Sequence, residues 1–120
     1  MTDVLVVDDS LVARKLLIRA LPSDWSVTLT QAANGLQALT EYRRTRHPIM
    51  FLDLNMPECD GYEVLQALHD EGITPTVIVL SGDIQPHAQE RVFKLGARAF
   101  VRKPATPEVI AKVLHEVGVR

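Results

Sequence analysis

Short apolar runs alternate with amphipathic stretches five times along the 120 residues, and this alternation limits the possible folds more than any other feature. The runs are VLVV at 4–7, VTLTQA at 27–32, IMFL at 49–52, TVIVL at 76–80 and the shorter AFV at 99–101. Nearly continuous apolar runs are typical of strands covered by helices on both faces, whereas VTLTQA alternates as an edge strand does. The pattern predicts an α/β fold, with an open parallel sheet and right-handed crossovers.

The stretches between the runs carry helix signals. Five residues can begin a helix as a cap or a first-turn proline, namely Ser10, Asn34, Asp60, Pro86 and Thr106. The apolar residues of the first predicted helix include Leu11, Leu16 and Leu17. We expect Phe93, in the fourth, to be a core or edge packing residue.

Length and charge narrow the classes of function. A chain of 120 residues has the size of one domain, so we expect a single unit over 1–120. The net charge of -2 gives no basic footprint, and direct nucleic-acid binding is not expected. No stretch reaches the ~20 apolar residues that span a bilayer, so no membrane association is expected either. A single cysteine, Cys59, excludes an internal disulfide and fits a cytoplasmic protein.

Polar side chains follow four of the five predicted strands. Asp8 and Asp9 follow the first run, Asp53 the third, Ser81 the fourth and Lys103 the fifth. Ligands of open parallel sheets bind beyond the carboxyl ends of the strands, so these groups should gather at one edge. Crowded carboxylates need positive charge, which Mg²⁺ and a lysine would supply. A carboxylate at such a site can be a nucleophile on phosphorus, with the serine hydroxyl bonded to the phosphoryl oxygens.

Each of these residues has an ordinary structural explanation when taken alone. Asp8 and Asp9 would more often form a strand-to-helix turn with a cap. Asp53 could be a loop acid before a methionine-proline turn, and Lys103 a solvated loop residue. Their joint arrival at the ends of four strands is what favours a functional site.

Histidine and cysteine residues give no second site. The four histidines lack the paired spacing of a zinc site and are expected on solvated faces; they are His47, His69, His87 and His115. Cys59 lies between two acidic residues, which disfavour its thiolate.

Four sequence blocks resemble the response-regulator receiver family, in the same order and across essentially the whole chain. They are VLVVDDS, FLDLNMPECDGYEVL, VIVLSGD and GARAFVRKP. The resemblance, which leans toward chemotaxis-type members, implies a flavodoxin-like doubly wound sheet of five strands in the order 2-1-3-4-5 with five helices. It also implies a two-component signalling switch rather than an enzyme. A sensor histidine kinase or phosphotransfer protein would donate the phosphoryl group, and an unknown output protein or domain would read the result.

The resemblance assigns the acceptor and the metal ligands. Asp53 matches the phosphoacceptor. Asp9, Asp53 and the backbone carbonyl of Asn55 would ligate Mg²⁺, while Asp8 would act largely through bound water. We therefore expect Mg²⁺-dependent self-phosphorylation and autodephosphorylation.

Further roles follow from the same resemblance. Ser81 and Lys103 would contact the phosphoryl group, and Ser81 and Phe100 would move together as the switch. Asn55 and Asp83 would control dephosphorylation. Phe100 stands where the family frequently has tyrosine, so a hydroxyl contact from this position to an output partner is absent.

Three alternatives remain beside a stand-alone switch. The chain can be a receiver domain excised from a larger multidomain regulator. An aspartyl-phosphate phosphatase of the haloacid-dehalogenase type fits less well, because Asn55 replaces the acid expected two residues after the nucleophile. A flavodoxin-like electron carrier fits poorly as well, since the acidic loop at 8–10 would repel a flavin phosphate.

Overall fold

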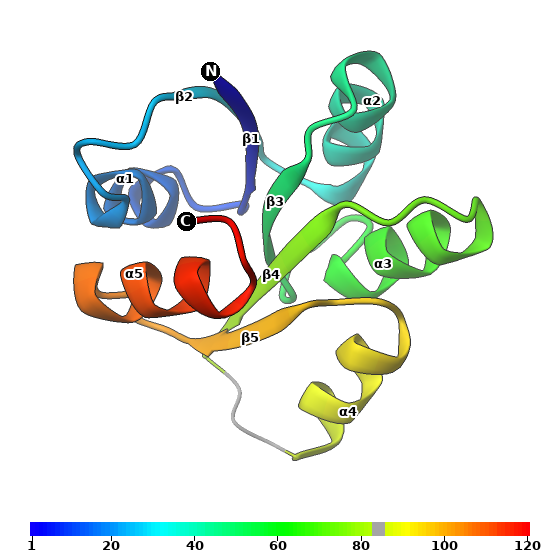
Figure 1. Ribbon diagram of the computed structural model, residues 1–120. Helices are drawn as coiled ribbons and strands as arrows, with labels where there is room; N and C mark the ends of the chain where they lie inside the picture. The colour runs from blue at the N-terminus through cyan, green and yellow to red at the C-terminus, as the bar shows by residue number, and fades with distance from the viewer. Residues whose placement is uncertain (83–85) are drawn as a thin grey trace.

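The computed structural model describes residues 1–82 and 86–120, which form five strands and five helices in strict alternation (Figure 1). The strands are β1 (Thr2–Val7), β2 (Val27–Ala32), β3 (Ile49–Asp53), β4 (Thr76–Ser81) and β5 (Ala99–Arg102). The helices are α1 (Leu11–Ala20), α2 (Gly35–Thr45), α3 (Gly61–Asp70), α4 (Pro86–Lys94) and α5 (Pro107–Glu116). All paired strands are parallel, in the order β2-β1-β3-β4-β5. The predicted strand order and element count are confirmed.

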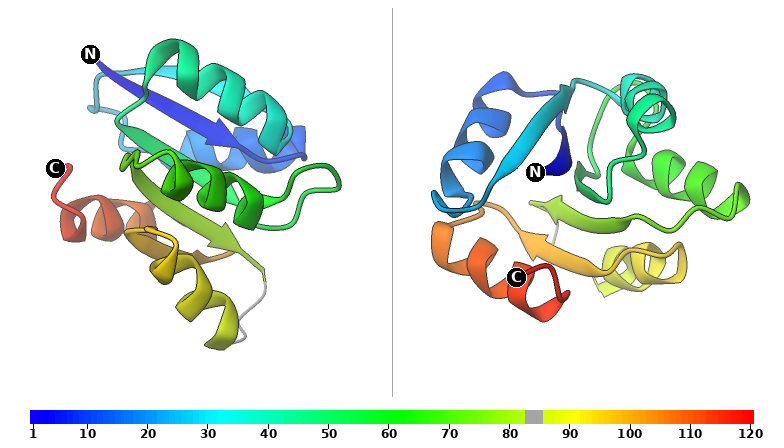
Figure 2. Two further views of the ribbon diagram at one scale, coloured as in Figure 1. Left: turned by 90° about the vertical axis from the view of Figure 1, so that its right-hand side faces the viewer. Right: turned by 45° about the horizontal axis from the view of Figure 1, so that its top comes forward.

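Helices cover both faces of the sheet. Figures 1 and 2 show α1 and α5 side by side on one face and α2, α3 and α4 on the other. The buried side chains accordingly form two hydrophobic clusters, one on each face. Alternate residues of β1 supply both: Val4 and Val6 pack toward α1 and α5, whereas Leu5 and Val7 pack toward the other helices.

The strands differ in burial as their positions require. All five residues of the central strand β3 are buried. β2 pairs on one side only, and Thr28 and Gln31 on it are exposed, which confirms the edge strand expected from its alternating sequence. β5 forms the opposite edge and is only 4 residues long.

The helices begin where the sequence predicts. Ser10, Asn34, Asp60 and Thr106 each accept a hydrogen bond from the backbone N–H three residues later. Glu63 completes a capping box with Asp60, and α4 begins at Pro86. None of the helices among the described residues is long and apolar enough to cross a membrane.

Two packing predictions are wrong. His47 was expected on a solvated face but is fully buried, because the turn from α2 leads directly into the central strand β3. Phe93 was expected to pack in the core or at its edge, yet it is an exposed residue, with 47% of its surface in solvent. The neighbouring Val92 occupies the buried side of α4, and successive helical residues differ by about 100° in direction. The other three histidines are exposed, as predicted.

Candidate functional site

The three predicted acids meet at the carboxyl edge of the sheet. β1 leads into Asp8 and Asp9, and β3 ends at Asp53. The strand order reverses between β1 and β3, where open α/β sheets bind their ligands. One oxygen from each carboxylate lies within 4.8 Å of the other two, and Asp8 and Asp53 are buried while Asp9 is exposed. The site therefore has two fixed acids and one that faces solvent.

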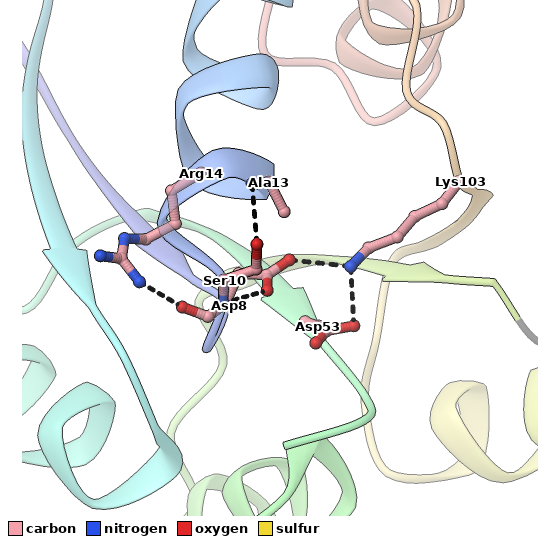
Figure 3. A network of polar contacts seen from close by, with 6 residues as sticks. All are labelled: Asp8, Ser10, Ala13, Arg14, Asp53 and Lys103. Carbon is pink, nitrogen blue, oxygen red and sulfur yellow. Dashed lines mark hydrogen bonds and ion pairs between the residues drawn. The ribbon is translucent and has the colours of Figure 1, made fainter. Parts of the chain in front are cut away.

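Lys103 joins two of these acids (Figure 3). Its Nζ lies 2.8 Å from Oδ2 of Asp8 and 3.1 Å from Oδ1 of Asp53. The backbone N–H of Lys103 also donates to the carbonyl of Ser81 at 2.9 Å, which holds the residue beside the end of β4. One ammonium thus faces carboxylates from two different strands.

Burial and crowding shift the pKa values of this pair. Burial raises the pKa of Asp53, and the charge of Asp8 raises it further; Lys103 and the backbone N–H of Asn55 only partly offset this. Burial alone would lower the pKa of Lys103, but its hydrogen bond to Asp8 and the charge of Asp53 outweigh that effect and raise it. The lysine is therefore held as a cation, while the charged form of Asp53 is disfavoured until more positive charge arrives.

The loop between β1 and α1 fixes Asp8 through several bonds. Its Oδ1 accepts from the backbone N–H of Ser10 at 2.9 Å, and its own N–H donates to the carbonyl of Ala32 in β2 at 3.1 Å. The Ser10 hydroxyl meanwhile caps α1 by accepting from Ala13 N at 3.2 Å. The acid cluster is therefore tied both to the first helix and to the sheet.

Ser81 and Phe100 lie on neighbouring strands. Ser81 ends β4 and is fully buried, and Phe100 is half-buried in β5 opposite Val79. Val79 and Phe100 both pack on the face covered by α2, α3 and α4. Side chains alternate along a strand, so Ser81, two residues after Val79, belongs to that face as well. The two predicted switch residues are thus one diagonal step apart.

The remaining predicted residues belong to loops. Asn55 is exposed in the loop after β3, next to the acceptor strand. Asp83 lies outside the described residues. Cys59 is half-buried in the same loop as Asn55; burial raises the pKa of its thiol, and Glu63 and Asp60 raise it further.

Two residues that shape the site were missed by the sequence analysis. Arg14 donates from Nη1 to the backbone carbonyl of Asp8 at 2.6 Å. Gly35 donates its N–H to the carbonyl of Cys59 at 3.1 Å, and a Cβ there would overlap that residue's carbonyl and thiol. A lone arginine near the start of a helix and a glycine after an asparagine cap are weak signals, because their partners are distant in sequence.

A groove lies beside the site, between α1 and the segment 103–107, with a volume of about 600 Å³. Its wall is mostly apolar, with Leu16 and Leu17 on the α1 side. Asp8 and Lys103 belong to its lining, so the groove opens directly onto the acid cluster.

The fold and this edge define a class of protein: a doubly wound α/β chain with clustered carboxylates and a lysine at the point where the strand order reverses. The family model of the response regulator receiver domain matches residues 4–115. The chain belongs to this receiver family, which serves two-component signal transduction.

Related proteins include both long and short members. The chain is 34% identical over 108 residues to protein-glutamate methylesterase/protein-glutamine glutaminase 1 of Syntrophus aciditrophicus, covering 88% of this chain and 31% of the relative. It is 28% identical over 118 residues to chemotaxis protein CheY of Listeria monocytogenes, covering 98% and 99%. The chain thus spans about a third of the length of the esterase relatives.

Solved structures agree with the fold. Chemotaxis protein CheY4 of Vibrio cholerae superposes with a TM-score of 0.86 at 28% identity, covering 98% of both chains. A CheX-CheY complex with beryllofluoride and magnesium from Borrelia burgdorferi gives a TM-score of 0.90 at 26% identity, covering 99% of this chain and 90% of that one. The receiver fold is therefore shared with chemotaxis regulators.

Proposed function

We propose that Asp53 accepts a phosphoryl group from a partner, and that the added charge changes a surface which an output partner reads. The observation that carries the proposal is the position of Asp53, buried at the end of β3, 3.1 Å from the ammonium of Lys103 and clustered with two more carboxylates. A structural ion pair needs one acid for each lysine. Three clustered acids, of which only two are bonded to the lysine, support a role that brings in further positive charge.

The donor set of this cluster fits a hard divalent cation. Asp8, Asp9 and Asp53 offer only carboxylate oxygens, which Mg²⁺ prefers to nitrogen and sulfur. In our proposal Asp9, Asp53 and the backbone carbonyl of Asn55 hold Mg²⁺, and Asp8 acts largely through bound water. When bound, the ion would neutralise charge on the phosphoryl oxygens.

The side chains of the site divide the work of transfer. A carboxylate oxygen of Asp53 attacks the phosphorus of a phosphohistidine while the phosphorus–nitrogen bond breaks, and the bonding electron pair leaves with the imidazole, which is then protonated. Lys103 donates hydrogen bonds to the phosphoryl oxygens, where negative charge is spread in the transition state. The Ser81 hydroxyl donates to the same oxygens once the group is in place.

The lifetime of the phosphorylated state depends on access for water. Asn55 is exposed beside the acceptor strand and small enough to leave a path to the phosphorus. We propose that Asn55 and Asp83 together control hydrolysis. The chain would thus remove its own phosphoryl group and reset.

The donor partner is a sensor histidine kinase or a phosphotransfer protein. The groove between α1 and 103–107 supports a place for it, because an apolar surface that opens onto Lys103 and Asp8 can seat a protein that must reach Asp53. Arg14 and Arg19 line the groove and favour an acidic rim on that partner. The output partner is a separate protein or domain. The Borrelia complex, in which a CheY with beryllofluoride and magnesium is bound to CheX, supports binding of a separate protein by this fold.

A second candidate is favoured by the long relatives: the chain is the receiver part of a larger regulator, whose activity it controls. Esterases in which the matched region is 31% to 34% of the length support this arrangement. The mass of the protein isolated from its native cells distinguishes the two candidates. Either way the chain acts as a switch rather than as an enzyme that turns over a substrate.

Acetyl phosphate tests the proposed chemistry without knowledge of the kinase. We expect one phosphoryl adduct per chain by mass spectrometry in the presence of Mg²⁺, stable in acid and labile in base, and none in Asp53→Asn. An adduct of equal yield in Asp53→Asn would contradict the assignment of the acceptor. Sustained hydrolysis of phosphomonoesters by the wild type would indicate an aspartyl-phosphate phosphatase instead.

A further inference from the structure

We propose that Arg14 is a positioning residue that aligns the acid cluster for Mg²⁺ by fixing the peptide group between Asp8 and Asp9. This inference rests on the proposed function, because it concerns the metal site of that function. Arg14 lies in α1, and its guanidinium donates to the backbone carbonyl of Asp8 (Figure 3). Its second partner is the side chain of Gln31, so both acceptors are neutral groups and not carboxylates.

The guanidinium of Arg14 connects the loop that follows β1 to strand β2. Nη1 donates to the carbonyl oxygen of Asp8 at 2.6 Å, and Nε donates to Oε1 of Gln31 in β2 at 2.9 Å. The two donors come from one planar group, so the distance and direction between the two acceptors are fixed together. The carbonyl of Asp8 is thereby held at a fixed position relative to β2. The N–H of Asp8 adds a second link to this strand through its bond to the carbonyl of Ala32.

The bonded carbonyl belongs to the peptide group that precedes Asp9. A peptide group is planar, so holding its oxygen also sets the direction in which the chain enters Asp9. Asp9 is the exposed member of the cluster, whereas Asp8 and Asp53 are buried and bonded to Lys103. Arg14 therefore acts on the acid that has the least support from its own surroundings. Residues that orient metal ligands in this way typically contribute 10–100-fold to metal affinity.

Charge alone predicts the opposite effect. A guanidinium close to the cluster repels a divalent cation, so its removal would raise Mg²⁺ affinity if Arg14 had no positioning role. A loss of affinity in Arg14→Ala thus separates positioning from electrostatics by sign and not only by size. Lys15 gives a matched control, because it is an exposed cation on the same helix and the next residue in the chain.

The first measurement is a Mg²⁺ titration of the whole chain. The amide NMR shifts of residues 8–10 and 53–55 monitor the binding. We expect the dissociation constant to rise about tenfold in Arg14→Ala, and to rise in the same direction but less in Gln31→Ala, which removes one of the two partners. Arg14→Lys should not restore affinity, because an ammonium cannot reproduce the fork. Lys15→Ala should stay within about twofold of the wild type.

The second measurement uses metal-free buffer, so it does not depend on Mg²⁺ binding. The amide of Ser10, which donates to Asp8 in the same loop, should exchange its hydrogen faster in Arg14→Ala than in the wild type or Lys15→Ala. Thermal unfolding in EDTA identifies variants that are not folded. If Arg14→Ala is not folded, Gln31→Ala replaces it as the test variant in both measurements.

The outcomes separate the two proposals. A wild type that binds no Mg²⁺ would overturn the proposed function, and the exchange rates would still decide whether Arg14 holds the loop. A wild type that binds Mg²⁺, with an unchanged or lower dissociation constant in Arg14→Ala, would overturn only the positioning role. An equal loss of affinity in Lys15→Ala would overturn it as well.

Discussion

His47 is the most unusual side chain of the core, because it is fully buried and neither ring nitrogen has a hydrogen-bond partner among the described residues. Burial lowers its pKa, and the charge of Arg44 acts in the same direction; Asp3 and Glu41 raise the pKa but do not compensate. The ring is therefore neutral in the folded chain at pH values where an unfolded histidine is already protonated.

This burial makes stability depend on pH. Below the ordinary histidine pKa of about 6.5 the unfolded chain binds a proton that the folded chain refuses, so the free energy of unfolding should fall as the pH is lowered. For one proton the slope is at most about 1.4 kcal/mol per pH unit. Urea unfolding between pH 5 and pH 8, the range about the normal histidine value, should show that His47→Leu flattens this slope while His69→Gln, on the surface, does not. Equal slopes in all three proteins would contradict the prediction.

A second prediction for a single residue concerns Asp53. Its raised pKa means that the folded chain holds the carboxylate ion at a cost, which is present at neutral pH and relieved when the group is protonated. Asp53→Asn should therefore raise the free energy of unfolding at pH 7 in EDTA, by on the order of 1 kcal/mol. Urea unfolding in EDTA tests this, and Asn55→Ala controls for a change near the same site. A clear loss of stability in Asp53→Asn would show that the bond to Lys103 outweighs the burial.

Sequence reasoning located the acids and Lys103, because strand ends in a parallel sheet must share an edge. It could not find Arg14, whose partner Gln31 is 17 residues away. It also misplaced His47, since a histidine between an arginine and a proline looks solvated. Its burial follows from its place in the short connection between α2 and the central strand β3, which the local sequence does not reveal.

Helix α1 shows most clearly that the spacing of apolar residues along a helix does not decide which of them are buried. Leu11 and Leu16 are 51% and 57% exposed, whereas Leu17 is 7% exposed, although all three are apolar residues of one short helix. Apolar residues on several sides of a helix remove the contrast from which a buried face is recognised. Which leucines of α1 are exposed is decided by how the helix packs against α5 and the sheet, and the helix sequence alone does not reveal it.

Adjacent leucines of α1 make a matched pair for a stability test. Leu17→Ala should lower the free energy of unfolding by about 2–4 kcal/mol, because it empties space in the core. Leu16→Ala should change it by less than about 1 kcal/mol, since the side chain is already mostly in water. Urea unfolding of both variants checks the assignment; similar losses would mean that Leu16 is covered in solution.

For the whole molecule, the alternation of strands and helices was enough to predict the parallel sheet with its helices on both faces. The strand order came from resemblance, because the sequence pattern of one chain does not say which side of β1 each later strand takes. The edge strand β5 has the weakest sequence signal, because it has only four residues; one of them is the half-buried Phe100.

The switch is a prediction about the whole molecule. A phosphoryl group adds acceptor oxygens near the end of β4, so the Ser81 hydroxyl should turn toward it and leave space that the Phe100 ring can fill. Burying part of that ring is worth on the order of 1–2 kcal/mol. Amide NMR spectra with beryllofluoride and Mg²⁺ should show changes spreading from the site into residues 86–102. In Ser81→Ala these changes should be strongly reduced.

Two results would count against this coupling. One is a wild-type response that stays within the loops around Asp53. The other is an undiminished response in Ser81→Ala. An output partner that binds the face of α4, β5 and α5 must prefer the inward ring, because a ligand shifts an equilibrium only by its difference in affinity.

The edge position of β5 lowers the free-energy cost of distorting the surface around this strand. β1 and β3, which present the acids, are bonded to strands on both sides, so moving either would break two ladders. β5 pairs with β4 alone, through four residues. Local distortion therefore costs least where Phe100 lies and most where Asp53 lies. In the proposed switch, the reacting groups therefore lie in the part of the sheet that is hardest to distort, and Phe100 lies at an edge that distorts more easily.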